Sequence, residues 1–160
     1  MLATSSRRLP RCLILAPATW GGAGFLPLMP GTWGTLAALP VWWLLARQGP
    51  WVYSLGTGLL LALALLVAGP AQELLGRHDH PAIVIDEAVG LMVALAGVAI
   101  DWPQAAAGCF LFRVFDVLKP WPIRALSRGT EGLDVVVDDV LAGVMARLTL
   151  EVLLLWWRSP

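Results

Sequence analysis

Two pairs of adjacent carboxylates, Asp86-Glu87 and Asp138-Asp139, lie within apolar stretches of this 160-residue chain. Together they could supply four oxygen ligands, and hard oxygen ligands suit Mg²⁺, which binds carboxylates together with water and substrate phosphate. The alternative is that these acids are solvated charges in the first turns of helices, where the helix dipole favours them. Because both pairs are embedded in apolar sequence, we favour a metal site formed by Asp86, Glu87, Asp138 and Asp139.

Basic groups that could bind phosphate lie at the C-terminal end of a third apolar stretch and just after it. Arg113 and Asp116 are three residues apart, so they share one face of a helix, and the carboxylate could hold the guanidinium in place. A simple intrahelical salt bridge is the alternative. Lys119 follows and could contact phosphate or lipid headgroups. We predict that Arg113, Asp116 and Lys119 take part in catalysis and that Arg113 and Lys119 bind phosphate, whereas Arg124 is better explained as an anchor at the membrane interface.

A short motif, Pro30-Gly31-Thr32, precedes another apolar stretch. At a helix start, backbone N–H groups can bind an anion, and glycine lets the backbone approach it closely. We therefore predict that Gly31 and Thr32 contact the substrate. A helix N-cap formed by Thr32 alone explains the motif almost as well.

A polar triplet, His78-Asp79-His80, could provide a metal ligand or a general acid for a leaving alkoxide. A polar surface turn is the alternative interpretation. We favour Asp79 and His80 over His78 as catalytic residues.

The composition indicates a membrane protein. The chain is 58% hydrophobic and 14% charged, whereas soluble domains carry roughly 25% charged residues. Most of its nine tryptophans stand near the ends of apolar segments, and tryptophan favours the membrane interface. The 11 basic and 11 acidic residues balance, with no basic tract that would indicate a nucleic-acid partner.

Five apolar stretches set the expected architecture: residues 32–46, 52–71, 82–100, 105–118 and 135–157. They are long, rich in Leu and Ala and do not alternate, which favours helix over strand. A full span needs about 20 residues, so the second, third and fifth reach or approach that length, and the first and fourth are short. We predict an all-α, compact helical bundle in a polytopic membrane protein with about four to five apolar helices. Residues 1–160 would form one domain with an N-terminal tail at 1–12.

The distribution of basic residues gives an orientation. If the N-terminus is cytoplasmic and the five segments alternate, basic residues favour the cytoplasmic loops. The cytoplasmic loops would hold Arg7, Arg8, Arg11, Arg77, Lys119, Arg124 and Arg128, and the outer loops Arg47 and Arg158. The apolar run after Arg11 is shorter than a signal peptide needs, so the N-terminal segment is expected to be uncleaved. All the candidate site residues then collect at the cytoplasmic face.

Several blocks in the same order and spacing resemble the phosphatidylglycerophosphatase A family, small bacterial membrane enzymes of phosphatidylglycerol synthesis. The blocks are Gly24-Phe25-Leu26-Pro27 with residues 30–38, His78-Asp79-His80 with Ile85-Asp86-Glu87-x-x-Gly90, Phe112-Arg113-x-x-Asp116 with residues 119–123, and Val137-Asp138-Asp139 with Ala142-Gly143. They extend over residues 13–157. Asp134 departs from the family pattern, in which a small residue is more usual, and adds a carboxylate near the site.

The resemblance implies an all-helical, Mg²⁺-dependent phosphomonoesterase. It would convert phosphatidylglycerophosphate to phosphatidylglycerol and phosphate at the cytoplasmic face of the bacterial inner membrane, among membrane lipids. The acid pairs would hold Mg²⁺, Arg113 and Lys119 would bind phosphate, and Asp79 or His80 would move the proton. Direct attack by water and an aspartyl-phosphate intermediate are both compatible with these residues, as are one and two metal ions.

Two other classes remain as alternatives. Another membrane lipid phosphotransferase would use similar carboxylates, but the Asp-Gly-x-x-Ala-Arg signature of the CDP-alcohol phosphatidyltransferases is missing. A membrane cation transporter would need charged groups near the bilayer midplane and paired broken helices. Here the predicted positions of the acids are near one face instead.

Overall fold

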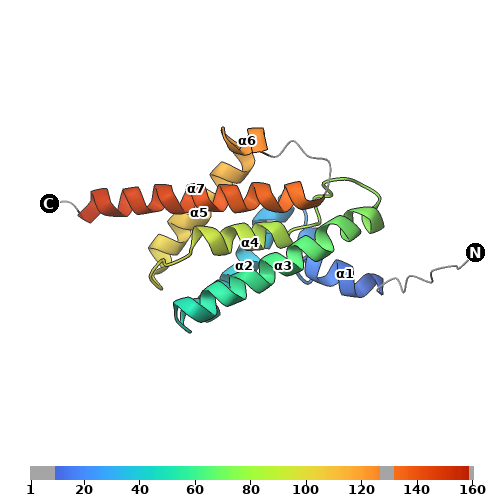
Figure 1. Ribbon diagram of the computed structural model, residues 1–160, viewed down its shortest axis with the longest axis horizontal. Coiled ribbons are helices and arrows are strands. Elements are labelled where there is room, and N and C mark those ends of the chain that lie inside the picture. Colours follow the sequence, from blue (N-terminus) through green and yellow to red (C-terminus); the bar gives the residue numbers. More distant parts are fainter. Residues whose placement is uncertain (1–9, 127–131, 159–160) are drawn as a thin grey trace, which may run out of the picture.

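Helices account for all the regular structure in residues 10–126 and 132–158, the part of the chain that this computed structural model describes (Figure 1). They are α1 (Arg11–Ala18), the 3₁₀ helix η1 (Ala23–Phe25), α2 (Pro30–Ala46), α3 (Pro50–Leu75), α4 (Ile85–Ala94), α5 (Trp102–Leu118), α6 (Ile123–Leu126) and α7 (Gly132–Arg158). The predicted all-α class is confirmed for these residues. Most of the predicted tail lies outside them, as do Arg7, Arg8 and Arg128, and α1 already begins at Arg11.

The short helix α4 lies at the centre of the bundle. It packs against α2, α3, α5 and α7, and Figure 1 shows it between α3 and α7. Eight of its ten residues are buried, including Leu91 and Met92. A helix that is apolar on all sides belongs in a protein interior or in lipid, and here protein surrounds it. The first turn of α4 therefore places Asp86 and Glu87 inside the bundle.

Close packing of α4 on α7 depends on two glycines. A Cβ atom on Gly143 of α7 would overlap the carbonyl oxygen of Gly90 in α4, and a Cβ on Gly90 would lie 2.7 Å from the carbonyl oxygen of Asp139. Small residues on facing helices allow backbones to approach in this way. The contact fixes α7, and with it Asp139, against the first turns of α4.

Replacing Gly143 with Ala is expected to destabilise the protein by about 1–3 kcal/mol, because the added methyl group meets backbone that cannot rotate away. Denaturant unfolding in detergent, followed by circular dichroism, would measure the change. Gly58→Ala on α3 is the matched control, because a Cβ there meets no atom within 4 Å. Equal stability of the two variants would contradict the close contact between α4 and α7.

Two helices of the described chain are long and apolar enough to cross a membrane: α3, and residues Asp134–Trp157 of α7. The bundle does contain five apolar helices, but the expectation that four to five segments cross the bilayer is too high. Residues 82–100 form only the ten-residue α4 with flanking turns, about 15 Å of helix against a hydrocarbon core of about 30 Å. Burial in protein, and not contact with lipid, explains the apolar composition of this segment.

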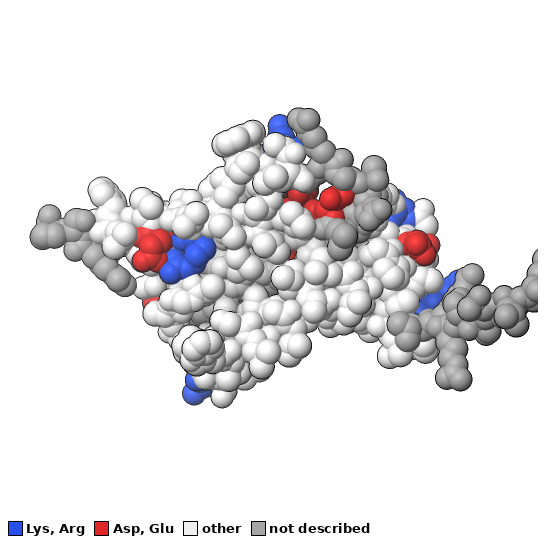
Figure 2. Space-filling model, in the orientation of Figure 1, with Lys and Arg blue, Asp and Glu red and all other residues white. Residues whose placement is uncertain are grey.

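The two candidate spans run in opposite directions. Figure 1 shows the end of α3 and the start of α7 at the same end of the molecule. Both helices expose large apolar side chains, for example Leu66 on α3 (72% exposed) and Val152 on α7 (65% exposed). Most of the face in Figure 2 is uncharged, and acidic side chains gather over the start of α7. The end at which these acidic side chains gather is therefore the end at which both spans would leave the membrane on the same side.

Candidate active site

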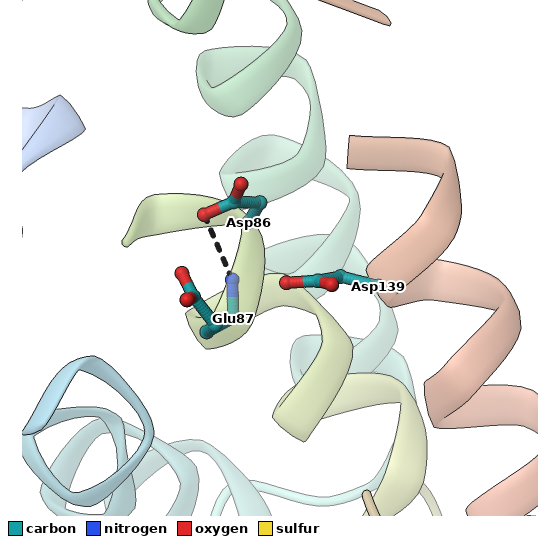
Figure 3. Close-up of side chains that lie close together, drawn as sticks. All are labelled: Asp86, Glu87 and Asp139. Carbon is teal, nitrogen blue, oxygen red and sulfur yellow. Dashed lines mark hydrogen bonds between the residues drawn. The ribbon is translucent and has the colours of Figure 1, made fainter. Parts of the chain in front are cut away.

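Three carboxylates from two helices form the centre of the candidate site. Asp86 and Glu87 lie in the first turn of α4, and Asp139 of α7 points toward that turn (Figure 3). One oxygen from each carboxylate lies within 4.8 Å of the others. Asp86 and Asp139 are buried, and the Glu87 N–H donates a hydrogen bond to Asp86 Oδ1 over 3.1 Å. This arrangement of oxygens could hold a metal ion.

The electrostatics of the group call for a positive charge. Burial raises the pKa of Glu87 well above its usual range, and the negative charge of Asp86 raises it further. Burial raises the pKa of Asp86 as well. Glu87 Oε2 is buried and has no hydrogen-bond partner among the described residues, and an unsatisfied carboxylate oxygen in such a place is costly. A bound cation would satisfy this oxygen and allow the carboxylates to ionise together, so the residues fit a metal site.

The side chain of Asp138 points in a different direction from that of Asp139. Its Oδ2 accepts a hydrogen bond of 2.7 Å from Nζ of Lys119, the residue that caps the C-terminus of α5. Burial lowers the pKa of Lys119, but the hydrogen bond and charge of Asp138, together with the charges of Asp139 and Asp116, raise it, and the net pKa is above the usual value. Asp138 thus lies outside the group of three carboxylates that the structure brings together, although the sequence placed it in the same predicted metal site.

Arg113 connects α5 to the carboxylates. Its Nη1 lies 2.6 Å from Asp116 Oδ2 and 3.9 Å from Glu87 Oε1. The predicted pairing of Arg113 with Asp116 is present, and it turns the guanidinium toward Glu87. The Arg113 side chain is about one-fifth exposed, so it can meet a ligand that approaches the carboxylates.

Gly31 brings the start of α2 into the same site. A Cβ atom at this position would overlap Glu87 Oε1 and would lie 2.9 Å from Arg113 Nη2. The N-cap of α2 is Met29, so the alternative in which Thr32 caps the helix is wrong. The N–H groups of Thr32 and Trp33 both donate to the Met29 carbonyl oxygen. The start of α2 therefore brings its backbone close to Glu87 and Arg113. It offers fewer free N–H groups to an anion than a helix start usually does.

A cavity of about 440 Å³ adjoins Lys119 and Asp138. Its lining also includes His78, Asp79, Arg124, Asp134 and Val135. His78 lines the cavity and His80 does not, although the sequence favoured His80. His80 Nδ1 instead accepts a hydrogen bond of 3.1 Å from the Ala82 N–H, within the turn that leads into α4.

Two residues of the cavity lining that were not predicted, Asp134 and His78, could have been found from their positions relative to predicted site residues. Asp134 and Asp138 are four residues apart on α7 and so share one helical face. His78 adjoins Asp79 in the polar triplet. The position of Arg124 in the cavity lining could not be predicted from spacing, because it depends on how the segment after Lys119 turns back toward α7.

Paired substitutions can distinguish a structural role of His80 in the turn from a role in catalysis. If His80 only holds the turn, His80→Asn should keep most of the activity, since an Asn side chain can accept the same bond from the N–H two residues later. His80→Ala should then lower stability, by about 1 kcal/mol. Activity and thermal unfolding of both variants would be measured. Loss of activity in a folded His80→Asn protein would show that the imidazole itself takes part in the reaction.

Residues 16–154 match the family model described as Phosphatidylglycerophosphatase A. The chain belongs to this family. Phosphatidylglycerophosphatase A of Escherichia coli (strain K12) is 39% identical over 128 residues, covering 78% of this chain and 74% of the relative. The Haemophilus influenzae protein of the same name is 34% identical over 143 residues, covering 88% and 80%.

A third relative carries a different name. A Bacteroides thetaiotaomicron protein provisionally named phosphatidylinositol-3-phosphatase is 33% identical over 150 residues, covering 89% of this chain and 94% of its own. No solved structure matches the chain. Membership of the phosphatidylglycerophosphatase A family identifies the chain as a phosphatase, and the expected resemblance is confirmed.

Proposed function

We propose that this protein hydrolyses phosphatidylglycerophosphate to phosphatidylglycerol and inorganic phosphate, with Mg²⁺ as cofactor. The observation that carries the proposal is the juxtaposition of three close carboxylates with two cationic side chains. Arg113 lies 3.9 Å from Glu87, and Lys119 is paired with Asp138, next to Asp139. Family membership supports the lipid substrate.

Asp86, Glu87 and Asp139 would hold the metal, with Asp138 at the margin of the group. Carboxylate oxygens that leave room for water and substrate phosphate are the usual ligands of Mg²⁺. When bound, the ion would neutralise charge on the phosphoryl oxygens and lower the pKa of a bound water. The unpartnered oxygens of Glu87 and Asp138 are consistent with a cation in this place.

The protein's own residues would bind and orient the phosphate. Hydrolysis forms a bond between a water oxygen and phosphorus and breaks the bond from phosphorus to the terminal glycerol oxygen. Arg113, held by Asp116, and Lys119 would stabilise charge on the phosphoryl oxygens. The attacking water loses one proton and the leaving glycerol oxygen gains one, and Asp79 on the cavity wall could accept and return this proton. His80 is the alternative donor, and Gly31 would let Glu87 and Arg113 lie against the α2 backbone, where they can face the phosphate.

The membrane arrangement follows from α3 and α7. If these two helices cross the bacterial inner membrane, the site lies where α3 ends and α7 begins. Arg77, Lys119 and Arg124 lie in the chain between α3 and α7, and the preference of basic loops for the cytoplasm supports a cytoplasmic position for that end. The lipid tails could then stay in the bilayer while the headgroup enters the site.

Phosphate release from two lipids tests the substrate. We expect a higher kcat/KM for phosphatidylglycerophosphate than for phosphatidylinositol 3-phosphate, each in the same neutral detergent micelles with Mg²⁺. The comparison addresses the name of the Bacteroides relative directly. A reversed preference would assign this site to phosphoinositides. Transport of Mg²⁺ into sealed vesicles without phosphate release would instead support a cation transporter.

A further inference from the structure

We infer that Arg124 binds a second anionic group of the lipid, the phosphodiester that links the glycerol headgroup to diacylglycerol. The inference rests on the proposed function, because it assumes a substrate with a phosphomonoester at one end of the headgroup and a phosphodiester at the other. The monoester would lie at the carboxylate group with Arg113. The rest of the headgroup would occupy the adjoining cavity.

The cavity is suited to this part of the substrate in size and position. Its volume of about 440 Å³ falls within the usual range of small-ligand pockets, roughly 300–1,000 Å³. It begins at Lys119 and Asp138, and Asp138 is next in sequence to Asp139 of the carboxylate group. Lys119 lies close enough to feel the charges of Asp139 and Asp116, so a headgroup with its monoester at the carboxylates would extend past the Lys119–Asp138 pair toward the cavity.

The charges in the cavity single out Arg124. Of the two Lys and Arg side chains that the described residues contribute to its lining, Lys119 is already paired with Asp138 over 2.7 Å. An anionic phosphodiester in the cavity would therefore be attracted to Arg124, whose charge is not taken up by the Lys119–Asp138 pair. A guanidinium can also bind a phosphate through two parallel N–H groups.

Arg124 is also positioned by the protein. Its Nη2 donates a hydrogen bond of 3.1 Å to the carbonyl oxygen of Leu118, at the end of α5. This bond uses one of the five N–H donors of a guanidinium. A side chain tethered in this way at the edge of a cavity loses less freedom when it binds a ligand. This hydrogen bond distinguishes Arg124 from a basic side chain that extends freely toward the headgroups of the surrounding lipids.

The test is the effect of Arg124→Gln on kcat and KM for phosphatidylglycerophosphate in neutral detergent micelles. We expect KM to rise by about tenfold to a hundredfold, as for loss of a hydrogen bond to a charged group, with kcat within about twofold. Arg124→Lys should restore part of the lost affinity. Arg77→Gln is the control, because it removes the same charge beside His78 but Arg77 does not line the cavity.

Two outcomes would overturn the inference. One is an unchanged KM for Arg124→Gln in neutral micelles. The other is a rise in KM that appears only when phosphatidylserine is added to the micelles, which would make Arg124 an anchor for anionic lipid in general. The same residue can be tested without catalysis by titrating phosphatidylglycerol, which keeps the phosphodiester but lacks the monoester. Weaker binding to Arg124→Gln than to Arg77→Gln would support the inference even if wild type did not hydrolyse phosphatidylglycerophosphate.

Discussion

Asp139→Asn is expected to lower kcat by about a thousandfold while the protein stays folded. Asn keeps the size of the side chain but removes a negative charge from the three-carboxylate group. Metal-ion stabilisation of phosphoryl transfer is worth several kcal/mol, and each increment of about 1.4 kcal/mol corresponds to a factor of ten in rate. Phosphate release at saturating lipid and Mg²⁺ would measure the loss.

The matched control for Asp139→Asn is Glu73→Gln, which removes an exposed carboxylate at the same end of the bundle. It should leave kcat unchanged. Circular dichroism and size-exclusion profiles of both variants would show whether they are folded. Activity of folded Asp139→Asn close to that of wild type would remove Asp139 from the metal site.

Gly31→Ala is expected to lower kcat/KM by about a hundredfold. The new methyl group would overlap Glu87 Oε1 and crowd Arg113, so both side chains must move. Displacing groups of an active site by about 1 Å can cost this much in rate. Thr35 Oγ1 donates to the Gly31 carbonyl oxygen over 2.8 Å, which holds this turn of α2 and limits its ability to adjust.

Gly69→Ala provides the control for Gly31→Ala, since a Cβ at Gly69 meets no atom within 4 Å. This control variant should retain wild-type kinetics. A Gly31→Ala protein with normal kcat/KM would mean that α2 does not approach the site as closely as the structure places it. Comparing the thermal unfolding of the two proteins would separate a local effect on the site from a general loss of stability.

Local sequence pattern was enough to predict the longer helices and the pairing of Arg113 with Asp116. The long apolar runs around α3 and α7 could only be helices, and Arg113 and Asp116 had to share a face. The number of spans could not be predicted in this way, because an apolar segment has the same composition whether protein or lipid surrounds it. The segment around α4 is the example: protein covers it on almost every side.

The grouping of the site residues depends on contacts that the local sequence pattern does not determine. Adjacent acids were expected to act together, but Asp139 faces Glu87 whereas Asp138 faces Lys119, because neighbouring residues on a helix point in different directions. His80 was favoured over His78, yet the packing of the bundle places His78 in the cavity lining, and His80 Nδ1 accepts a local hydrogen bond from the Ala82 N–H. The closeness of Gly31 to Glu87 required α2 to pack across the start of α4, which no spacing within either segment reveals.

The most direct test of the proposed function is phosphate release from phosphatidylglycerophosphate by the purified wild-type protein, first with EDTA and then with added Mg²⁺. We predict no release with EDTA and full recovery when Mg²⁺ exceeds the chelator. Equal release under both conditions would contradict a metal site at Asp86, Glu87 and Asp139. No release under either condition, from protein shown to be folded, would contradict the proposed substrate.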